Sequence, residues 1–292
     1  MHRNVSSVAR GIVAACTALG VVACGSSSPT GGGQHAASIT VSPPTASLAA
    51  GDSVALTATV KDAQGNTISN PTITWSASDT DAVAISASGV VSTLLPATDT
   101  ITATSDGVSG TAVVTVQAPT PIQMHEGGLV GTVTFPNGST ASGGQGDPVD
   151  TIPCGSGADA EHYHVHLSLF VNGQQQAMPL GVGIDNAVVV GDSLAIAGTC
   201  FYWLHAHDRT GIIHVEPAET GHTFTLGEYF DIWGEPLTSS NVAGNQGDVT
   251  VYIDGARYLG DPRAIVLAAH QQITLEVGTR VAPPVYAFPP DY

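Results

Sequence analysis

Closely spaced histidines are the feature of this sequence best suited to do chemistry. Nine of the 11 histidines lie after residue 120, and six of these form two tight groups. The first group is HYHVH at 162–166, and the second is HAH at 205–207 followed by a further histidine at 214. Neutral imidazole is the commonest protein ligand of transition metals and suits both zinc and copper. The predicted ligands are His162, His164, His166, His205, His207 and His214.

The spacing within each group matches a β-strand, in which alternate side chains point to the same face. A strand over 162–171 would place the first three imidazoles on one face. If residues 208–211 form a four-residue turn, His205 pairs with His214, and the second group also shares a face. A bulge at Gly211 would shift this pairing by one residue. An HxH pair with a third histidine on the neighbouring strand can coordinate one ion.

The cost of such an arrangement favours a metal ion over simple hydration. Several imidazoles on one face give up apolar packing, and they would repel one another if protonated. A cation offsets that cost because it binds neutral ring nitrogens. The alternative is a solvated outer face of a strand, but only 11% of this chain is charged, where roughly 25% is usual. We therefore predict a copper or zinc site, with Asp208 and Glu216 orienting the rings from a second shell.

The cysteines add a constraint on the same region. In an oxidising compartment Cys154 and Cys200 are expected to form a disulfide. The alternative is that a cysteine serves as a metal-binding thiolate. Cys16 lies in a predicted N-terminal leader and is expected to be lost with it.

Composition and motifs exclude several function classes. The chain carries 7 Lys+Arg against 24 Asp+Glu, a formal charge of −17, so nucleic-acid binding is excluded. Its 42% hydrophobic content excludes general disorder. No nucleophile elbow, phosphate-binding loop, HExxH or dinucleotide motif is present, so catalytic residues stay unassigned. A metalloenzyme remains an alternative, with Tyr202, Trp203 and Trp233 able to line a pocket.

The residues around the histidines predict an all-β segment over 125–292. We expect strands at 129–135, 162–171, 187–197, 200–207, 211–215, 222–226, 249–253 and 264–277. A capping-box pattern at 225–228 predicts one short helix that continues through Trp233. The proline-rich, aromatic tail at 283–292 is expected to pack along an edge. A β-sandwich or barrel fits this pattern, with a cupredoxin-like fold as one form that it could take.

The preceding part of the chain predicts a separate β-sandwich. Residues 38–117 contain short alternating strands with frequent turns, including a hairpin turn at 64–66 and a core aromatic at Trp75. The run from ITVSPPTASLAAGDSVALTATV to SGTAVVTV resembles the bacterial Ig-like domain of group 2. That resemblance implies a stalk or adhesive module at a bacterial surface, with no catalytic residues. Residues 118–124 are expected to be the linker.

The first 37 residues predict export and anchoring. The apolar run at 11–23 is too short to span a bilayer and is typical of a signal peptide. Val21-Val22-Ala23-Cys24 resembles a bacterial lipobox, which implies cleavage before Cys24 and lipidation of that residue. Residues 24–37 are then a flexible tether. The expected location is the cell envelope, at the outer membrane, with the lipid anchor as the only contact with the membrane.

Four sequence blocks support a second resemblance. HxHxHLxxFVNG, CFYWLHxHDxxGIIHxE, FTLGEYFDIWGEPL and a late LxxHxxIxLxVG together resemble an uncharacterised bacterial envelope family, which brings no activity with it. The sequence therefore predicts a lipid-anchored protein that stores, scavenges or delivers copper or zinc, with another envelope protein as a conceivable partner. The alternatives are a metalloenzyme, copper oxidase-like or a zinc hydrolase, and a surface adhesion module with structural histidines.

Overall fold

The computed structural model describes residues 34–156 and 160–292. The predicted signal peptide at 1–23 and the lipidation site Cys24 lie outside the described residues. Within the described ranges, no helix is both long enough and apolar enough to cross a membrane. The structure confirms an all-β chain with one short α-helix.

The Ig-like part folds around an aliphatic core built from alternating strand residues, including Val41, Val91 and Ile101. The half-buried Trp75 packs against this core. Its sheets have the strand orders β1-β4, β2-β9-β8-β5 and β3-β7-β6. The strands are β1 Ser38–Ser42, β2 Thr45–Ala49, β3 Ser53–Ala55, β4 Thr57–Lys61, β5 Thr74–Ala77, β6 Val83–Ile85, β7 Val90–Thr93, β8 Ala97–Ser105 and β9 Val108–Gln117. The predicted turn at 64–66 is present, because Asp62 accepts hydrogen bonds from the backbone N–H groups of Gln64 and Asn66.

The histidine-rich segment, residues 125–292, is organised by one mixed sheet. Its order is β11-β14-β13-β25-β23-β24, and β20 pairs with both β13 and β19. Its strands are β11 Thr132–Val133, β13 Tyr163–Val171, β14 Gln174–Ala177, β19 Leu204–His205, β20 Ile212–Val215, β23 Val249–Ile253, β24 Ala256–Tyr258 and β25 Gln272–Val277. Asn172 and Gly173 both have positive φ and form the predicted turn between β13 and β14.

Smaller sheets of two or three strands complete this part of the structure. They are β10 Ile122–Gln123 with β26 Tyr286–Ala287, β12 Cys154–Gly155 with β18 Cys200–Tyr202 and β15 Ile184–Asp185, β16 Val188–Val190 with β17 Leu194–Ala197, and β21 Asn241–Val242 with β22 Asn245–Gln246. Cys154 and Cys200 form the predicted disulfide, which joins β12 to β18. Both sulfurs are thereby removed as thiolate ligands.

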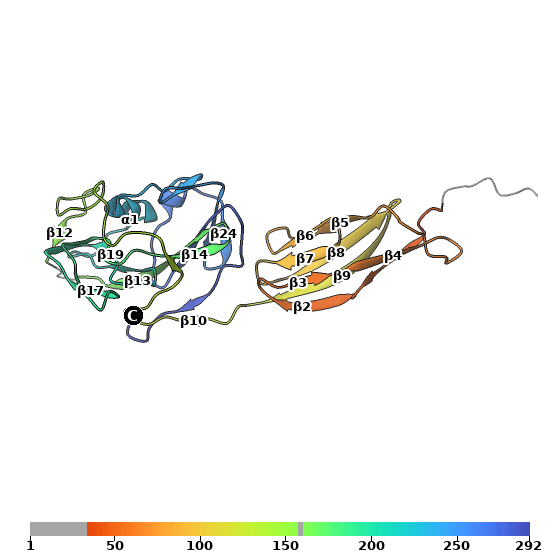
Figure 1. The fold of residues 1–292 in the computed structure, drawn as a ribbon, viewed down its shortest axis with the longest axis horizontal. Helices are drawn as coiled ribbons and strands as arrows, with labels where there is room; N and C mark the ends of the chain where they lie inside the picture. The colour runs from red at the N-terminus through yellow and green to blue at the C-terminus, as the bar shows by residue number, and fades with distance from the viewer. Residues whose placement is uncertain (1–33, 157–159) are drawn as a thin grey trace, which may run out of the picture. The chain divides into compact units, whose positions relative to one another are not determined.

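Strand β13 divides the segment into an apolar face and a histidine face. Val165, Leu167 and Leu169 belong to the main core, together with residues of α1 (Leu226–Trp233). His164 and His166 alternate with them and point to the opposite face, as the HxHxH spacing predicts. Figure 1 shows α1 against the strands of this segment. The histidines therefore lie on the side of the sheet away from the helix.

The predicted capping box sets the start of α1. The Thr225 hydroxyl accepts a hydrogen bond from the Glu228 backbone N–H, and the Glu228 carboxylate accepts one from the Thr225 backbone N–H. Tyr229, Phe230 and Trp233 are then fully buried in the core. The helix ends at Gly234, whose φ of 83° is left-handed.

Several predicted strands differ from the structure. Residues 187–197 form the hairpin β16–β17, because Gly191 and Asp192 both adopt positive φ within a continuous apolar pattern. Residues 264–277 are a strand only from Gln272, since the 3-10 helix η1 (Pro262–Ala264) and the positive φ of His270 interrupt the alternation. The strand predicted at 129–135 is reduced to β11, and the one at 200–207 is divided into β18 and β19.

Candidate metal centre

Three adjacent strands bring the two histidine groups together. His214 on β20 is paired with His205 on β19 and with His164 on β13. The pairing of His205 with His214 is the register predicted for a simple four-residue turn. His162 precedes His164 by two residues, and His207 follows His205 by two residues. Each side of His214 therefore has a pair of imidazoles. The result is two candidate ligand sets that share His214. From here on, the first group is the set of His162, His164 and His214, and the second group is the set of His205, His207 and His214.

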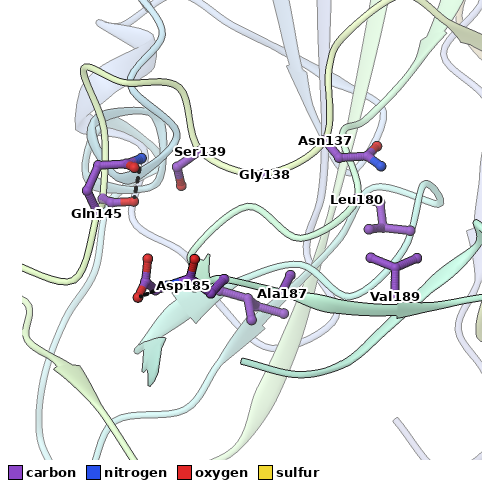
Figure 2. Close-up of a pocket in the computed structure, with 11 residues that line it drawn as sticks. Asn137, Gly138, Ser139, Gln145, Leu180, Asp185, Ala187 and Val189 are labelled. Atoms are coloured by element: carbon purple, nitrogen blue, oxygen red, sulfur yellow. Dashed lines mark hydrogen bonds between the residues drawn. The ribbon is translucent and has the colours of Figure 1, made fainter. Parts of the chain in front are cut away.

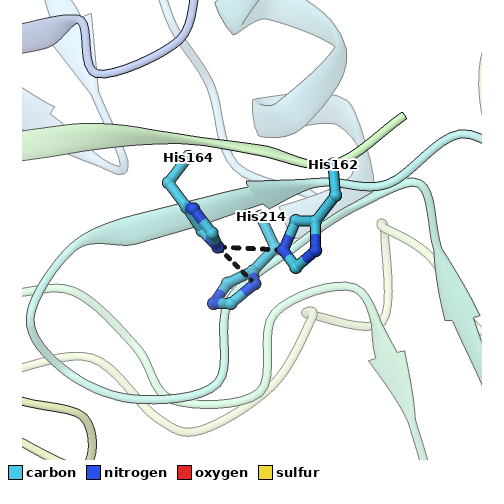
Figure 3. Close-up of side chains that lie close together, drawn as sticks. All are labelled: His162, His164 and His214. Atoms are coloured by element: carbon cyan, nitrogen blue, oxygen red, sulfur yellow. Dashed lines mark hydrogen bonds between the residues drawn. The ribbon is translucent and has the colours of Figure 1, made fainter. Parts of the chain in front are cut away.

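The first group forms a compact donor set with Glu216. His164 Nε2 lies 3.0 Å from His162 Nε2 and 3.2 Å from His214 Nδ1, as Figure 3 shows. The Glu216 carboxylate is 2.9 Å from His162 Nε2 and 3.2 Å from His214 Nδ1, through the same oxygen, Oε1. These four contacts form a closed ring of donors.

The size of this ring suits a metal ion. Zinc–nitrogen bonds of about 2.0–2.1 Å place tetrahedral donors about 3.3–3.4 Å apart. The four measured edges, between 2.9 and 3.2 Å, are slightly shorter than this separation. Three imidazoles and one carboxylate therefore lie as close together as the ligands of one ion.

The second group shows a pair of facing acceptors. His205 Nδ1 lies 2.9 Å from the carbonyl oxygen of Tyr202, and His207 Nδ1 lies 2.6 Å from that of Ala195. A carbonyl oxygen can only accept, so both Nδ1 atoms carry the proton and donate it. In the neutral rings both Nε2 atoms are then unprotonated, and they lie 3.1 Å apart. Two lone pairs at that distance repel unless a cation lies between them.

Burial disfavours the protonated form of three of the candidate rings at neutral pH. The pKa values of His164, His205 and His214 are each lowered to about 3, chiefly by burial and then by neighbouring histidines. The nearby Glu216 carboxylate opposes this shift for His164 and His205 without reversing it. These rings are neutral at pH 7, which is the form that binds a metal.

One predicted ligand, His166, lies outside both groups. Its Nε2 is 2.9 Å from the carbonyl oxygen of Thr210, and its ring packs against Tyr286 with centroids 4.0 Å apart. Burial lowers its pKa to about 4. Because its Nε2 is held by the Thr210 carbonyl, His166 shares the face of His164 but joins neither ligand set.

The two predicted carboxylates have different surroundings. The buried Asp208 accepts hydrogen bonds from the backbone N–H groups of Gly127 and Thr210, so its contacts stabilise the turn before β20. Glu216 contacts His162 and His214 directly, and its Oε2 lies 3.6 Å from His205 Nε2. Glu216 is therefore placed as a potential ligand, closer to the centre than the predicted second-shell role.

The aromatic tail covers the histidine face. The ring of Tyr292 stacks on His164 with centroids 4.2 Å apart, and β26 brings Tyr286 against His166. His270 Nε2 lies 3.0 Å from the carbonyl oxygen of Tyr292 and belongs to neither group. The sequence predicted that this tail packs along an edge but gave no sign that it shields the candidate ligands.

Two cavities of this segment differ in their relation to the histidines. A cavity of about 250 Å³ is lined by Phe201, Tyr202 and Trp203 together with His205 and Glu216 of the candidate centre. A second cavity, of about 350 Å³, is lined largely by polar side chains such as Asn137, Gln145 and Asp185, and has no histidine in its lining (Figure 2). Only the first of these two gives access to the candidate metal ligands.

Comparisons with known proteins identify the N-terminal fold. Residues 35–116 match the family described as bacterial Ig-like domain (group 2). This part of the chain is a bacterial Ig-like domain, as its strands indicated. No curated protein matches the chain.

Solved structures add only weak similarities. The S-layer protein rSbsC is 24% identical over 31% of this chain, with a TM-score of 0.28, and the match spans 14% of the S-layer chain. Domains 5–6 of SbsC are 14% identical over 85% of this chain and all of theirs, at a TM-score of 0.27. The adhesin InvE of Yersinia pseudotuberculosis is 13% identical over 82% of this chain and 58% of its own, at 0.22. Scores this low carry no argument about the histidine-rich segment.

Proposed function

We propose that the histidine-rich segment binds a transition-metal ion, copper or zinc. The observation that carries this proposal is the pair of Nε2 atoms of His205 and His207, 3.1 Å apart, with both Nδ1 protons donated to backbone carbonyls. A hydrogen bond cannot form between two unprotonated nitrogens, and the low pKa of His205 disfavours a proton on its Nε2. A metal ion satisfies both lone pairs at once.

The donor set supports divalent copper or zinc. It consists of imidazole nitrogens and one carboxylate, which suit both ions, and the disulfide removes the thiolates that would favour Cu(I). Calcium and magnesium prefer oxygen ligands, which are in the minority here. Copper binds nitrogen sites more tightly than zinc in the usual order of affinities, so availability decides between them.

The proposed biological role is storage, scavenging or delivery of this ion at the cell envelope. The lipobox resemblance around Cys24 supports anchoring by lipid at the outer membrane, and the Ig-like domain is of a type that commonly serves as a spacer. The ion would be the main partner, and another envelope protein could receive it. Buried ligands with one exposed member, His162, at 46% side-chain exposure, suit an ion that enters from solvent.

A second candidate function is metalloenzyme activity. The observation that favours it is the cavity lined by Trp203, Phe201 and two members of the centre, His205 and Glu216. An enzyme needs a coordination position that a substrate or water can reach. Azide added to the copper-loaded protein tests for such a position. A new charge-transfer band indicates an open site, and an unchanged spectrum indicates closed sites that only bind metal.

Metal content is the direct test of the proposed function. The purified chain, produced from residue 25 onward, is stripped with chelator, reloaded with zinc or copper, and freed of loose metal before elemental analysis. We expect retained metal in the wild type and a clear loss in the double variant His205→Ala, His207→Ala. His222→Ala is the matched control, since that ring packs on Trp203 outside both groups.

Equal metal content in the wild type and the double variant would contradict the proposal. A wild type that retains no metal would favour the remaining alternative, an adhesion module with structural histidines.

A further inference from the structure

The centre contains more donors than one zinc or copper ion requires. Five histidines and Glu216 lie in the two groups, whereas protein zinc sites are almost always four-coordinate. These ligand atoms are also arranged regularly across the sheet. His205, His214 and His164 occupy one row across β19, β20 and β13, with neighbouring strands about 4.8 Å apart. The pair His162 and His164 therefore approaches His214 from the β13 side, and the pair His205 and His207 approaches it from the β19 side.

His214 has one nitrogen for each side. Its Nδ1 belongs to the first group, at 3.2 Å from both His164 Nε2 and Glu216 Oε1. Figure 3 shows the other ring nitrogen of His214 at the opposite edge of the ring from this contact. The ring of His207 lies 4.6 Å from that of His214, at 72° to it, and the ring of His205 lies 5.3 Å away. The second pair is thus close to the His214 ring, and its ligand atoms lie within 4.8 Å of one nitrogen of that ring.

We propose that the protein binds two metal ions bridged by the His214 imidazole, an inference that rests on the proposed function. The first ion takes His162 Nε2, His164 Nε2, His214 Nδ1 and Glu216 Oε1. The second ion takes the Nε2 atoms of His205, His207 and His214.

Charge and protons balance in this arrangement. A neutral imidazole that binds metal through both nitrogens must give up its ring proton, so binding of the second ion releases one proton from His214 to solvent. The resulting imidazolate carries one negative charge, and Glu216 carries another. These two charges reduce the repulsion between two dications held on opposite edges of one ring. Oε2 of Glu216, 3.6 Å from His205 Nε2, adds negative charge on the side of the second ion.

The two sites are expected to differ in openness. The first ion has four protein donors, which leave no open coordination position, as in structural zinc sites. The second has three, and its ligand His205 lines the cavity that contains Trp203 and Phe201. Exogenous ligands such as azide should therefore bind at the second ion and leave the first unchanged.

The test combines metal stoichiometry with electron paramagnetic resonance of the copper-loaded chain. We expect two ions per wild-type chain, and one ion each in His162→Ala, which removes a ligand of the first ion, and in His207→Gln, which removes one of the second. His162 is half exposed, so its removal leaves the core intact. His125→Ala is the control that should keep both ions. Circular dichroism identifies any variant that has lost its fold.

The copper spectrum tests the bridge itself. Two Cu(II) ions joined by one imidazolate couple magnetically, so the wild type should show a weakened, broadened signal, and each single-site variant an isolated Cu(II) signal of full intensity per ion. One ion per wild-type chain would overturn the two-ion proposal and leave the proposed function standing. Two ions with uncoupled signals would overturn the bridge by His214. No bound metal would overturn the proposed function itself.

Discussion

The Ig-like domain and the histidine-rich segment satisfy their buried polar groups in different ways. In the Ig-like domain, Asp62 accepts from the backbone of its own turn, Asp99 accepts from the backbone of Ser78, and the Thr93 hydroxyl donates to carbonyl oxygens. In the histidine-rich segment, the buried rings of His205 and His214 face other histidines and one carboxylate. The buried groups named in the first domain therefore form hydrogen bonds within that domain. The second leaves the Nε2 atoms of His205 and His207 facing each other as two acceptors.

This difference teaches where stability and function are coupled. When a metal site forms only in the folded state, the free energy of metal binding adds to the stability of that state. The Ig-like domain has no such group among its described residues, so its stability should not respond to metal. The contrast can be tested by changes that act on one region and spare the other.

Metal removal should have the largest effect. At a free metal concentration a thousandfold above Kd, one ion stabilises the folded state by about 4 kcal/mol, and two ions by more. Differential scanning calorimetry of the reloaded chain should show the transition of the histidine-rich segment moving to lower temperature when chelator is added. The transition of the Ig-like domain should stay in place and serves as the internal reference. If both transitions move together, or neither moves, the two regions do not differ in the way described.

Much of this difference between the two regions could be predicted from the sequence, because the difference depends on local patterns. Alternation in HxHxH predicted which face of β13 the histidines occupy, and the turn length at 208–211 predicted the pairing of His205 with His214. The capping box gave the start of α1. Each of these follows from residues that are close together in the chain.

What the sequence did not show depends on contacts between distant residues. The stacking of Tyr292 on His164 joins positions far apart in the chain, and no periodicity records it. The direct contact of Glu216 with His162 and the separation of His166 depend on how β20 pairs with β13. The hairpin at 187–197 was missed because its turn residues interrupt an otherwise uniform apolar run.

Loss of the disulfide should have the next largest effect and should also be confined to the histidine-rich segment. Cys154 and Cys200 close a loop with a sequence separation of 46. Removing such a crosslink costs about 2–4 kcal/mol, chiefly through the freedom gained by the unfolded chain. The variant Cys154→Ala, Cys200→Ala should lower the melting temperature of this segment, measured in metal-free buffer. A matching shift in the transition of the Ig-like domain would contradict separate responses of the two regions.

A buried carboxyl group makes the stability of the histidine-rich segment depend on pH. Glu276 on β25 is fully buried, and burial raises its pKa to about 7. The unfolded chain releases this proton near pH 4.5 and the folded chain near pH 7, so the stability contributed by the protonated group is present below pH 4.5 and lost as pH rises to 7. Glu276→Gln keeps the shape without the charge. We expect it to be more stable than the wild type by about 1–3 kcal/mol at pH 8.

The pH profile separates this cause from a change in packing. At pH 4 the carboxyl is protonated in both states, so the difference between Glu276→Gln and the wild type in urea unfolding should nearly vanish. A stabilisation of equal size at both pH values would show that the charge is not its source. Metal content should stay at the wild-type value, since Glu276 lies in neither histidine group.

The smallest expected effect comes from the reciprocal experiment in the Ig-like domain. Ile101 on β8 is fully buried in the aliphatic core, and Ile101→Val removes one methylene group. Such a change typically costs about 0.5–1.5 kcal/mol, because the cavity relaxes only in part. Calorimetry should show a lower transition for the Ig-like domain with an unchanged metal response of the histidine-rich segment. Because Ile101 packs among aliphatic residues of this domain and contacts no candidate metal ligand, the loss should be the same with and without metal. A metal-dependent loss would mean that the two regions fold as one cooperative unit.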